Sequence, residues 1–120
     1  MRLLSLSLVA TALMAAQAAS AQPAPPAEAE ALTRTYVCEE GAVLRVAYLN
    51  FASGESHAVV DFGGQLVPMR AGPTGSGVRY VAFDPENGLV WHSKGDEGVL
   101  ADDSDSNQQT ILRDCRATVG

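Results

Sequence analysis

The sequence predicts an all-β domain, a small eight-stranded antiparallel β-barrel closed by one disulfide. Short segments that alternate apolar and polar residues are separated by clusters of Gly, Asn, Asp and Ser. No stretch of the folded part keeps a 3.6-residue periodicity. The two cysteines, Cys38 and Cys115, lie at the two ends of this part. Eight strands can close into a barrel filled by side chains, although periodicity alone also allows a sandwich.

Residues 1–21 have the form of a secretory signal peptide. Arg2 supplies the positive start, an apolar run follows, and Ala19-Ser20-Ala21 offers the small residues that a signal peptidase reads. The alternative is a transmembrane anchor, but the run is short for a span of roughly 20 residues. We therefore expect cleavage after Ala21 and a periplasmic protein. No Cys stands at the cleavage point, so we expect no stable membrane anchor.

The segment after the signal peptide, residues 22–32, is rich in Pro and Ala. This composition favours extended, solvated chain, and we expect a disordered leader. Residues 33–118 then form one domain with a modest core. Such a small core gains from a covalent link. In an exported chain the pair Cys38 and Cys115 is expected to form a disulfide.

The charge balance is acidic. The precursor has 8 basic and 14 acidic residues, a net charge of −6, and loss of Arg2 makes it about −7. Nucleic-acid binding needs clustered Lys and Arg, so it is not expected. An acidic surface favours a cationic partner through long-range attraction, with ordinary solubility as the alternative interpretation.

The first half of the folded part contains four expected strands. Glu39-Glu40-Gly41 ends the first of them. In the second, Leu44, Val46 and Tyr48 share one face. Gly63-Gly64 indicates a tight hairpin between the third and the fourth. These expected strands are 33–38, 43–49, 57–62 and 65–69.

The second half follows the same pattern. A Gly-rich loop covers residues 71–77, and residues 84–88, Asp-Pro-Glu-Asn-Gly, indicate a second hairpin. Residues 94–97 form a turn, and residues 102–109 form a polar, acidic loop. The expected strands are 78–83, 89–93, 98–101 and 110–115.

Ser76, His92 and Asp96 include the residue types of a catalytic triad. However, no G-x-S-x-G motif is present, and a triad is defined by geometry rather than by composition. A small filled barrel also leaves little room for a substrate cleft. His92 alternates with Trp91 and is interpreted as a surface histidine. We therefore expect a protein that is not an enzyme and that uses no cofactor.

The acidic loop invites a calcium hypothesis. Asp103, Asp105 and Asn107 fit the first half of a calcium-binding loop, and Asp114 stands at the twelfth position. Gln108 replaces the Gly that the sharp turn requires. A solvated acidic loop is the favoured interpretation, and no metal is expected.

The remaining candidates for functional residues lie in two loops. Glycines flank Ser76 on both sides, so its hydroxyl lies on accessible backbone. Lys94 is the only lysine in the chain and precedes Gly95, which places it at the tip of a tight turn. A protruding ammonium in an acidic protein can enter an anionic cleft, although a solvated turn lysine is the alternative.

The sequence resembles the bacterial inhibitors of C-type lysozyme, which occur in membrane-bound and periplasmic forms. The similarity runs from Tyr36-Val37-Cys38 to Cys115 and covers nearly all of the folded part. An S-G-x-x-Y element stands at residues 76–80, and a K-G-x-x-x-x-L element stands at residues 94–100. The family pattern usually has a second Ser two positions before Ser76, where this chain has Thr74.

The resemblance implies an eight-stranded barrel whose two loops enter the lysozyme active-site cleft and block peptidoglycan hydrolysis. Ser76 and Lys94 are the key contacts that it implies, because lysozyme works with two carboxyl groups that an ammonium can pair with. Tyr80 and Trp91 have packing as an alternative role, which we favour for Trp91. The expected lysozyme-binding residues are Ser76, Gly77, Arg79, Tyr80, Lys94 and Gly95.

The resemblance also implies a partner, a basic host lysozyme of the C type, and a possible homodimer. A competing hypothesis is a binding module of the same fold for another cell-wall enzyme or for peptidoglycan. The segment 84–88 looks longer than the family hairpin, so the spacing between the two loops stays open.

Overall fold

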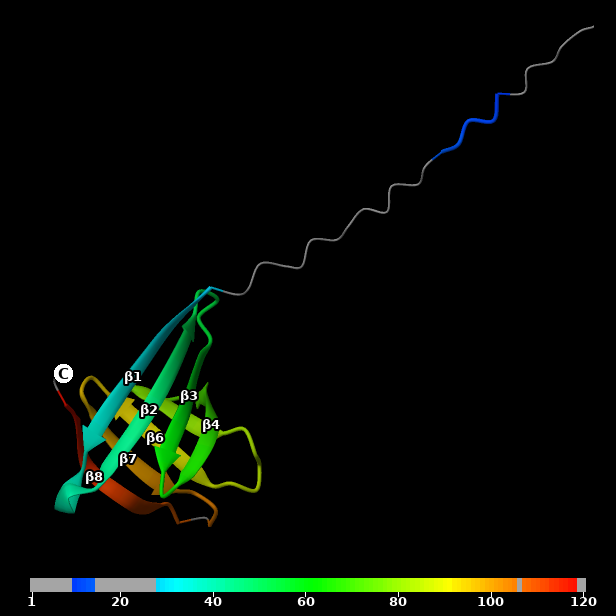
Figure 1. Cartoon of the computed structure of the whole chain (residues 1–120). Coiled ribbons are helices and arrows are strands. Elements are labelled where there is room, and N and C mark those ends of the chain that lie inside the picture. The colour runs from blue at the N-terminus through cyan, green and yellow to red at the C-terminus, as the bar shows by residue number, and fades with distance from the viewer. Residues whose placement is uncertain (1–9, 15–27, 106, 119–120) are drawn as a thin grey trace, which may run out of the picture.

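The structure is a computed structural model that describes residues 10–14, 28–105 and 107–118. The expected cleavage at Ala21 and residues 22–27 of the expected leader lie outside these residues. Eight antiparallel strands form one closed barrel (Figure 1), which confirms the predicted fold class and excludes the sandwich. The elements are β1 Ala29–Val37, η1 Glu39–Gly41, β2 Val43–Phe51, β3 Ser56–Phe62, β4 Gln65–Gly72, β5 Val78–Ala82, β6 Leu89–Lys94, β7 Glu97–Asp102 and β8 Gln109–Ala117.

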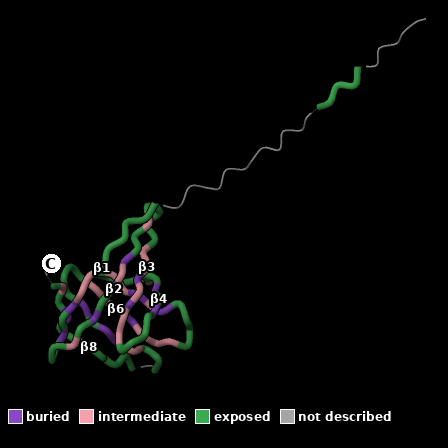
Figure 2. Tube along the Cα trace, in the orientation of Figure 1, coloured by how far each residue is buried: buried purple, intermediate pink, exposed green. Residues whose placement is uncertain are grey.

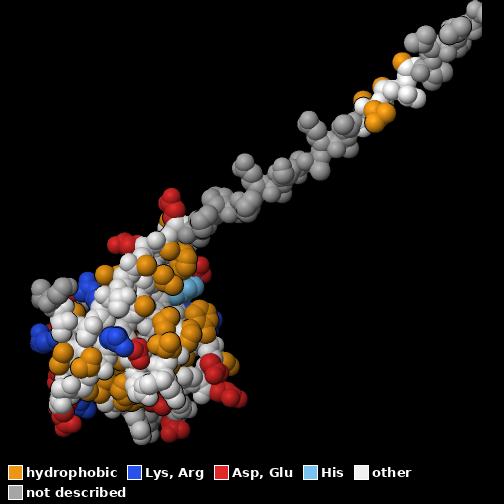
Figure 3. Space-filling model, viewed as in Figure 1, with side chains coloured by type: hydrophobic (Ala, Val, Ile, Leu, Met, Phe, Trp, Pro, Cys, Tyr) orange, Lys and Arg blue, Asp and Glu red, His pale blue; other side chains and the backbone are white. Residues whose placement is uncertain are grey.

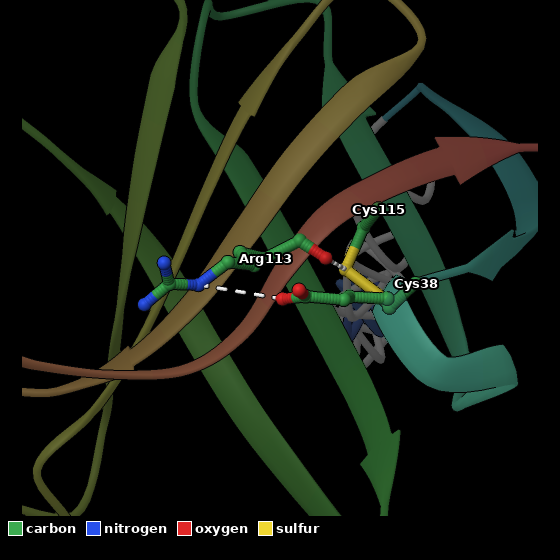
Figure 4. Close-up of a disulfide and its surroundings, with 4 residues drawn as sticks. Cys38, Arg113 and Cys115 are labelled. Carbon is green, nitrogen blue, oxygen red and sulfur yellow. Dashed lines mark hydrogen bonds and ion pairs between the residues drawn. A yellow bond between two sulfur atoms is a disulfide. The ribbon is translucent and has the colours of Figure 1, made fainter.

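Each strand pairs with the next one in the sequence, and β8 returns to β1. The closing seam is short, because β1 and β8 share only the pairs Tyr36↔Ala117 and Val37↔Arg116. The disulfide between Cys38 and Cys115 supports this seam from just beyond β1 (Figure 4), as the sequence predicts. Arg113 of β8 reaches back to the carboxylate of Glu39, at 3.5 Å, beside the same disulfide.

The first strand begins earlier than the sequence indicates. β1 starts at Ala29, so residues 29–32 of the expected leader are strand and pair with the end of β2, from Ala29↔Phe51 to Leu32↔Tyr48. These β1 residues are exposed, and a strand held by backbone pairing alone leaves little hydrophobic pattern. Together with the β2–β3 turn they project from one end of the barrel (Figure 1).

The core lies inside the barrel, where buried positions alternate with exposed ones along the strands (Figure 2). Leu44, Val46 and Tyr48 all face this core, as their alternation predicts. Trp91 is fully buried and lies edge-on to Tyr36, with ring centroids 4.9 Å apart. The interior is therefore filled by side chains.

The polar ends of the buried aromatic residues bind one another. Trp91 Nε1 donates to the Tyr48 hydroxyl at 2.8 Å, and the hydroxyls of Tyr48 and Tyr36 lie 2.7 Å apart. The Tyr80 hydroxyl meets Ser56 Oγ at 2.8 Å. No buried side-chain nitrogen or oxygen in the described part of the chain lacks a partner. The core thus avoids the desolvation cost of unpaired polar groups.

These tyrosines make stability sensitive to alkaline pH. Burial raises the pKa of Tyr36, Tyr48 and Tyr80 above the ordinary value of 10.0. The unfolded chain therefore loses phenol protons at lower pH than the folded chain, and stability falls as pH rises above about 10. Urea unfolding at pH 8 and pH 11 should show this loss. The loss from pH 8 to pH 11 should be smaller in Tyr48→Phe, and an equal loss in this variant would contradict the assignment.

Gly98 of β7 is required by the indole above it. A Cβ at Gly98 would overlap the Trp91 ring atoms Cη2 and Cζ2, which have no room to move in the core. We expect Gly98→Ala to lower the free energy of unfolding by about 1–3 kcal/mol, the usual cost of overpacking. Gly72→Ala is the matched control in a strand, since its Cβ would meet only the Arg79 carbonyl oxygen at 3.6 Å. Equal stability of the two variants by urea unfolding would contradict this explanation.

The outer surface carries a second aromatic cluster. His57 lies edge-on to both Phe51 and Phe83, with ring centroids 5.3 Å apart in each pair, and the Arg70 guanidinium lies 5.8 Å from the centre of the Phe83 ring. Figure 3 shows hydrophobic side chains gathered on the visible face of the barrel, which carries β3 and β4. Aromatic pairs of this kind add about 0.5–1.5 kcal/mol each to the packing.

No helix in the described residues is long and apolar enough to cross a bilayer.

Candidate functional site

The two loops singled out in the sequence lie side by side. We call residues 73–77, between β4 and β5, the Ser76 loop, and residues 94–97, between β6 and β7, the Lys94 turn. The register of β5 and β6 pairs Val78 with Ser93, so both connections leave the barrel at the same end. At Gly77, which has a φ of 68°, a Cβ would overlap the Ser93 carbonyl oxygen and lie 3.1 Å from Lys94 Cβ. Glycine is therefore needed both for the backbone conformation and for this close approach.

Ser76 is exposed at the tip of its loop. Its carbonyl oxygen accepts two hydrogen bonds, from Thr74 Oγ1 at 3.1 Å and from His92 Nε2 at 2.8 Å. Thr74, which stands where the family pattern has a second Ser, thus uses its hydroxyl for a hydrogen bond within the loop. These contacts fix the backbone on which the Ser76 side chain is carried.

Lys94 is exposed at the end of β6, and its backbone lies opposite that of Glu97 in the register of β6 and β7. Gly95 has a φ of 58° at the first central position of this turn, where hairpins with this geometry favour Gly. No carboxylate of the described residues lies within ion-pair distance of the Lys94 ammonium. The turn therefore presents its charge to solvent without an internal partner.

Three contacts attach the Lys94 turn to the strands of the barrel seam. Asp96 Oδ1 accepts a hydrogen bond from Arg34 of β1 at 2.8 Å. The Asp96 carbonyl oxygen accepts the backbone N–H of Ala117 of β8, also at 2.8 Å. Glu97 pairs with Arg116 at 3.1 Å. The turn is thus anchored to both β1 and β8.

A hollow of about 300 Å³ lies beside the Lys94 turn. His92 and Lys94 line one side, and Asp114 and Arg116 of β8 line the other. Asp114 has a φ of 53°, and the register between β7 and β8 is irregular next to it. Such a bulge bends the strand locally and opens the surface. The exposed loops thus adjoin a concave area that carries both signs of charge.

Comparison with known proteins assigns this arrangement to a family. The family model described as membrane-bound lysozyme-inhibitor of c-type lysozyme matches residues 36–109. This match spans more than half of the chain and includes both loops. The chain belongs to this inhibitor family. Membership confirms the family resemblance, and because the matched proteins are inhibitors it also confirms that the chain is not an enzyme.

Two solved structures of the inhibitor family are similar to the chain. The periplasmic lysozyme inhibitor of C-type lysozyme from Salmonella typhimurium shows 26% identity and a TM-score of 0.67, and the match covers 75% of this chain and 100% of that one. MliC from Pseudomonas aeruginosa, solved in complex with hen egg white lysozyme, shows 26% identity and a TM-score of 0.61, with coverage of 82% and 91%. No curated protein matches the chain significantly in sequence.

The structure brings most of the expected binding residues together. Ser76, Gly77, Lys94 and Gly95 lie in the two adjacent loops. Arg79, the second residue of β5, is half-buried and forms an ion pair with Asp103 at 3.1 Å.

Tyr80, also among the expected binding residues, lies elsewhere. Its side chain is only 3% exposed and points into the core, and Trp91 is buried as well. Of the two roles considered for Tyr80, packing is the one that its position supports.

The catalytic and calcium hypotheses find no support in the geometry. His92 contacts the Ser76 carbonyl oxygen rather than its hydroxyl, and Asp96 is bound to Arg34, so these residues assemble no triad. Asp103 of the acidic loop is engaged by Arg79. Within residues 10–14, 28–105 and 107–118, no three His, Cys, Asp or Glu side chains are grouped to hold a metal ion.

Proposed function

We propose that the chain is a periplasmic inhibitor of C-type lysozyme that inserts the Ser76 loop and the Lys94 turn into the active-site cleft. The observation that carries the proposal is the contact of Gly77 with Ser93 and Lys94. It brings the two loops together, so that the exposed Ser76 lies in the loop next to Lys94, whose ammonium has no ion-pair partner among the described residues. The sequence of residues 1–21, which has the form of a signal peptide, supports the periplasmic location.

The chemistry of the target fits these two groups. Lysozyme cleaves its substrate with two carboxyl groups, one acting as the acid and one as the nucleophile or stabiliser. An ammonium near this pair gains charge-assisted hydrogen bonds, and the Ser76 hydroxyl adds a further one. Occupation of the cleft then excludes the sugar chain by volume, so no reaction by the inhibitor is needed. The complex of the Pseudomonas aeruginosa relative with hen egg white lysozyme supports this choice of partner.

The charge of the whole chain supports the encounter. Its net charge of −6 is opposite to that of a basic lysozyme, and such complementarity raises association rates more than it raises affinity. The Lys94 ammonium differs from the neighbouring Arg34 and Arg116 guanidinium groups, because they are paired with Asp96 and Glu97 and it is paired with no described carboxylate. We infer that the negative net charge of the chain attracts the enzyme and that the Lys94 ammonium contacts the carboxyl groups in the cleft.

The direct test is inhibition of hen egg white lysozyme by the chain that begins at Gln22, measured by lysis of bacterial cells at low and moderate salt. We expect inhibition near one-to-one stoichiometry, with slower association at higher salt. An N-acetylglucosamine oligosaccharide that fills the cleft should compete with the inhibitor. Binding without competition would overturn the insertion mechanism. No binding to several C-type lysozymes would overturn the choice of partner and favour another cell-wall target.

A further inference from the structure

His92 connects the two loops, although its alternation with Trp91 in the sequence indicates only a surface histidine. It lies on β6 two residues before Lys94, and across the sheet it is opposite Arg79 on β5 and Val99 on β7. Its ring is half-buried and lines the hollow beside the Lys94 turn. His92 is therefore on the same strand as Lys94, and its ring reaches from this strand to the Ser76 loop.

In the hydrogen bond between His92 and Ser76, the donor must be the histidine. The carbonyl oxygen of Ser76 can only accept a hydrogen bond, so the Nε2 atom of His92, 2.8 Å away, must carry the hydrogen. The same oxygen accepts the Thr74 hydroxyl at 3.1 Å. The Thr74 bond is made within the loop, whereas the His92 bond ties the Ser76 carbonyl to β6, the strand that carries Lys94.

The ring of His92 also packs on the next residue of the loop. A Cβ at Gly77 would lie 3.2 Å from His92 Nε2. The loop is thus held against β6 by a hydrogen bond at Ser76 and by close packing at Gly77. Without the ring, the packing of Gly77 on Ser93 and Lys94 and the bond from Thr74 would remain, but the Ser76 carbonyl would lose its link to β6.

We propose that His92 is a positioning residue, which holds the Ser76 backbone at a fixed place relative to the Lys94 ammonium. The inference rests on the proposed function, because it explains how the two groups reach a lysozyme cleft together. A loop that is ordered before binding loses less conformational entropy in the complex. A loop that is ordered only part of the time binds more weakly, in proportion to the fraction of competent molecules.

The test compares His92→Phe, which keeps a ring but no donor, with His92→Gln, which keeps a donor. Binding of hen egg white lysozyme is followed by a surface method that gives both rates. We expect His92→Phe to weaken affinity about three- to tenfold, the range of one hydrogen bond, mainly through slower association. His92→Gln should recover most of this loss. Equal affinities of wild type and His92→Phe, or equal losses in both variants, would overturn the inference.

Two further measurements separate positioning from simple destabilisation and from failure of the proposed function. In a Ser76→Ala background the effect of His92→Phe should shrink, because the positioned group is gone. In the free protein, NMR order parameters of residues 74–77 should fall in His92→Phe and not in His92→Gln. If wild type does not bind lysozyme while this NMR difference is seen, the proposed function fails and the positioning of the Ser76 loop by His92 stands. Unchanged order parameters in His92→Phe would refute this positioning whatever the binding result.

Discussion

Replacing Lys94 by Ala is expected to weaken inhibition of a C-type lysozyme by more than about 30-fold. Truncation of one member of a buried charge pair at an interface costs about 2–5 kcal/mol, and each 1.4 kcal/mol is a factor of ten in affinity. In this chain the ammonium has no partner among the described residues, so its removal exposes no unpaired internal charge. The loss should therefore fall on the complex, seen as faster dissociation, while the unfolding midpoint in urea stays within experimental error.

The matched control is Arg45→Ala. This substitution removes one positive charge from β2, where the Arg45 side chain is 64% exposed and pairs with Asp61. Exposed ion pairs contribute about 0–1 kcal/mol, so we expect a change in inhibition below about fivefold. A comparable loss in both variants would show that the net charge matters and the position of Lys94 does not. That outcome would remove the central contact of the proposed mechanism.

Loss of the disulfide is expected to have the largest effect on stability. Cys38 and Cys115 are 77 residues apart in the sequence, and the chain-entropy account of such a link gives about 4–5 kcal/mol. The link supports a seam in which only two residue pairs of β8 and β1 are in register, so strand pairing there is short when the link is absent. We expect the double variant Cys38→Ala/Cys115→Ala to approach this loss in urea unfolding.

The reduced wild-type protein is the control for this variant. Both should be destabilised to a similar extent, because the bond rather than the sulfur atoms provides the constraint. A loss below about 1 kcal/mol in both would show that the strand pairing alone closes the barrel. A loss in the double variant only would assign the effect to the packing of the two buried side chains.

The sequence predicts the barrel well because strand alternation directly reports which face is buried. Leu44, Val46 and Tyr48 show this, and the Lys94 turn follows from a lysine placed before a glycine. The start of β1 was misplaced because residues 29–32 are held by backbone pairing to β2, and backbone pairing leaves no mark on side-chain type.

The missed parts of the site depend on contacts through space. His92 acts on a backbone carbonyl oxygen in a loop 16 residues earlier, and nothing in its residue type or spacing indicates that acceptor. Gly98 likewise looks like an ordinary glycine at the start of a strand, because the sequence does not show that the Trp91 ring packs on it. The sequence places Tyr80 in a family motif, but it does not show whether the side chain is buried in the core or exposed for binding.

The anchoring of the Lys94 turn to the seam sets an order for maturation. Strands β1 to β7 can pair as they emerge, since each needs only its predecessor. The turn is complete only when Ala117 reaches the Asp96 carbonyl oxygen and Arg34 reaches the Asp96 side chain. A nascent or C-terminally truncated chain lacks the first of these contacts, and a chain with free thiols holds both less firmly. Under the proposed mechanism we therefore expect full inhibitory strength only when synthesis and oxidation are finished, and we expect inhibition to report complete assembly.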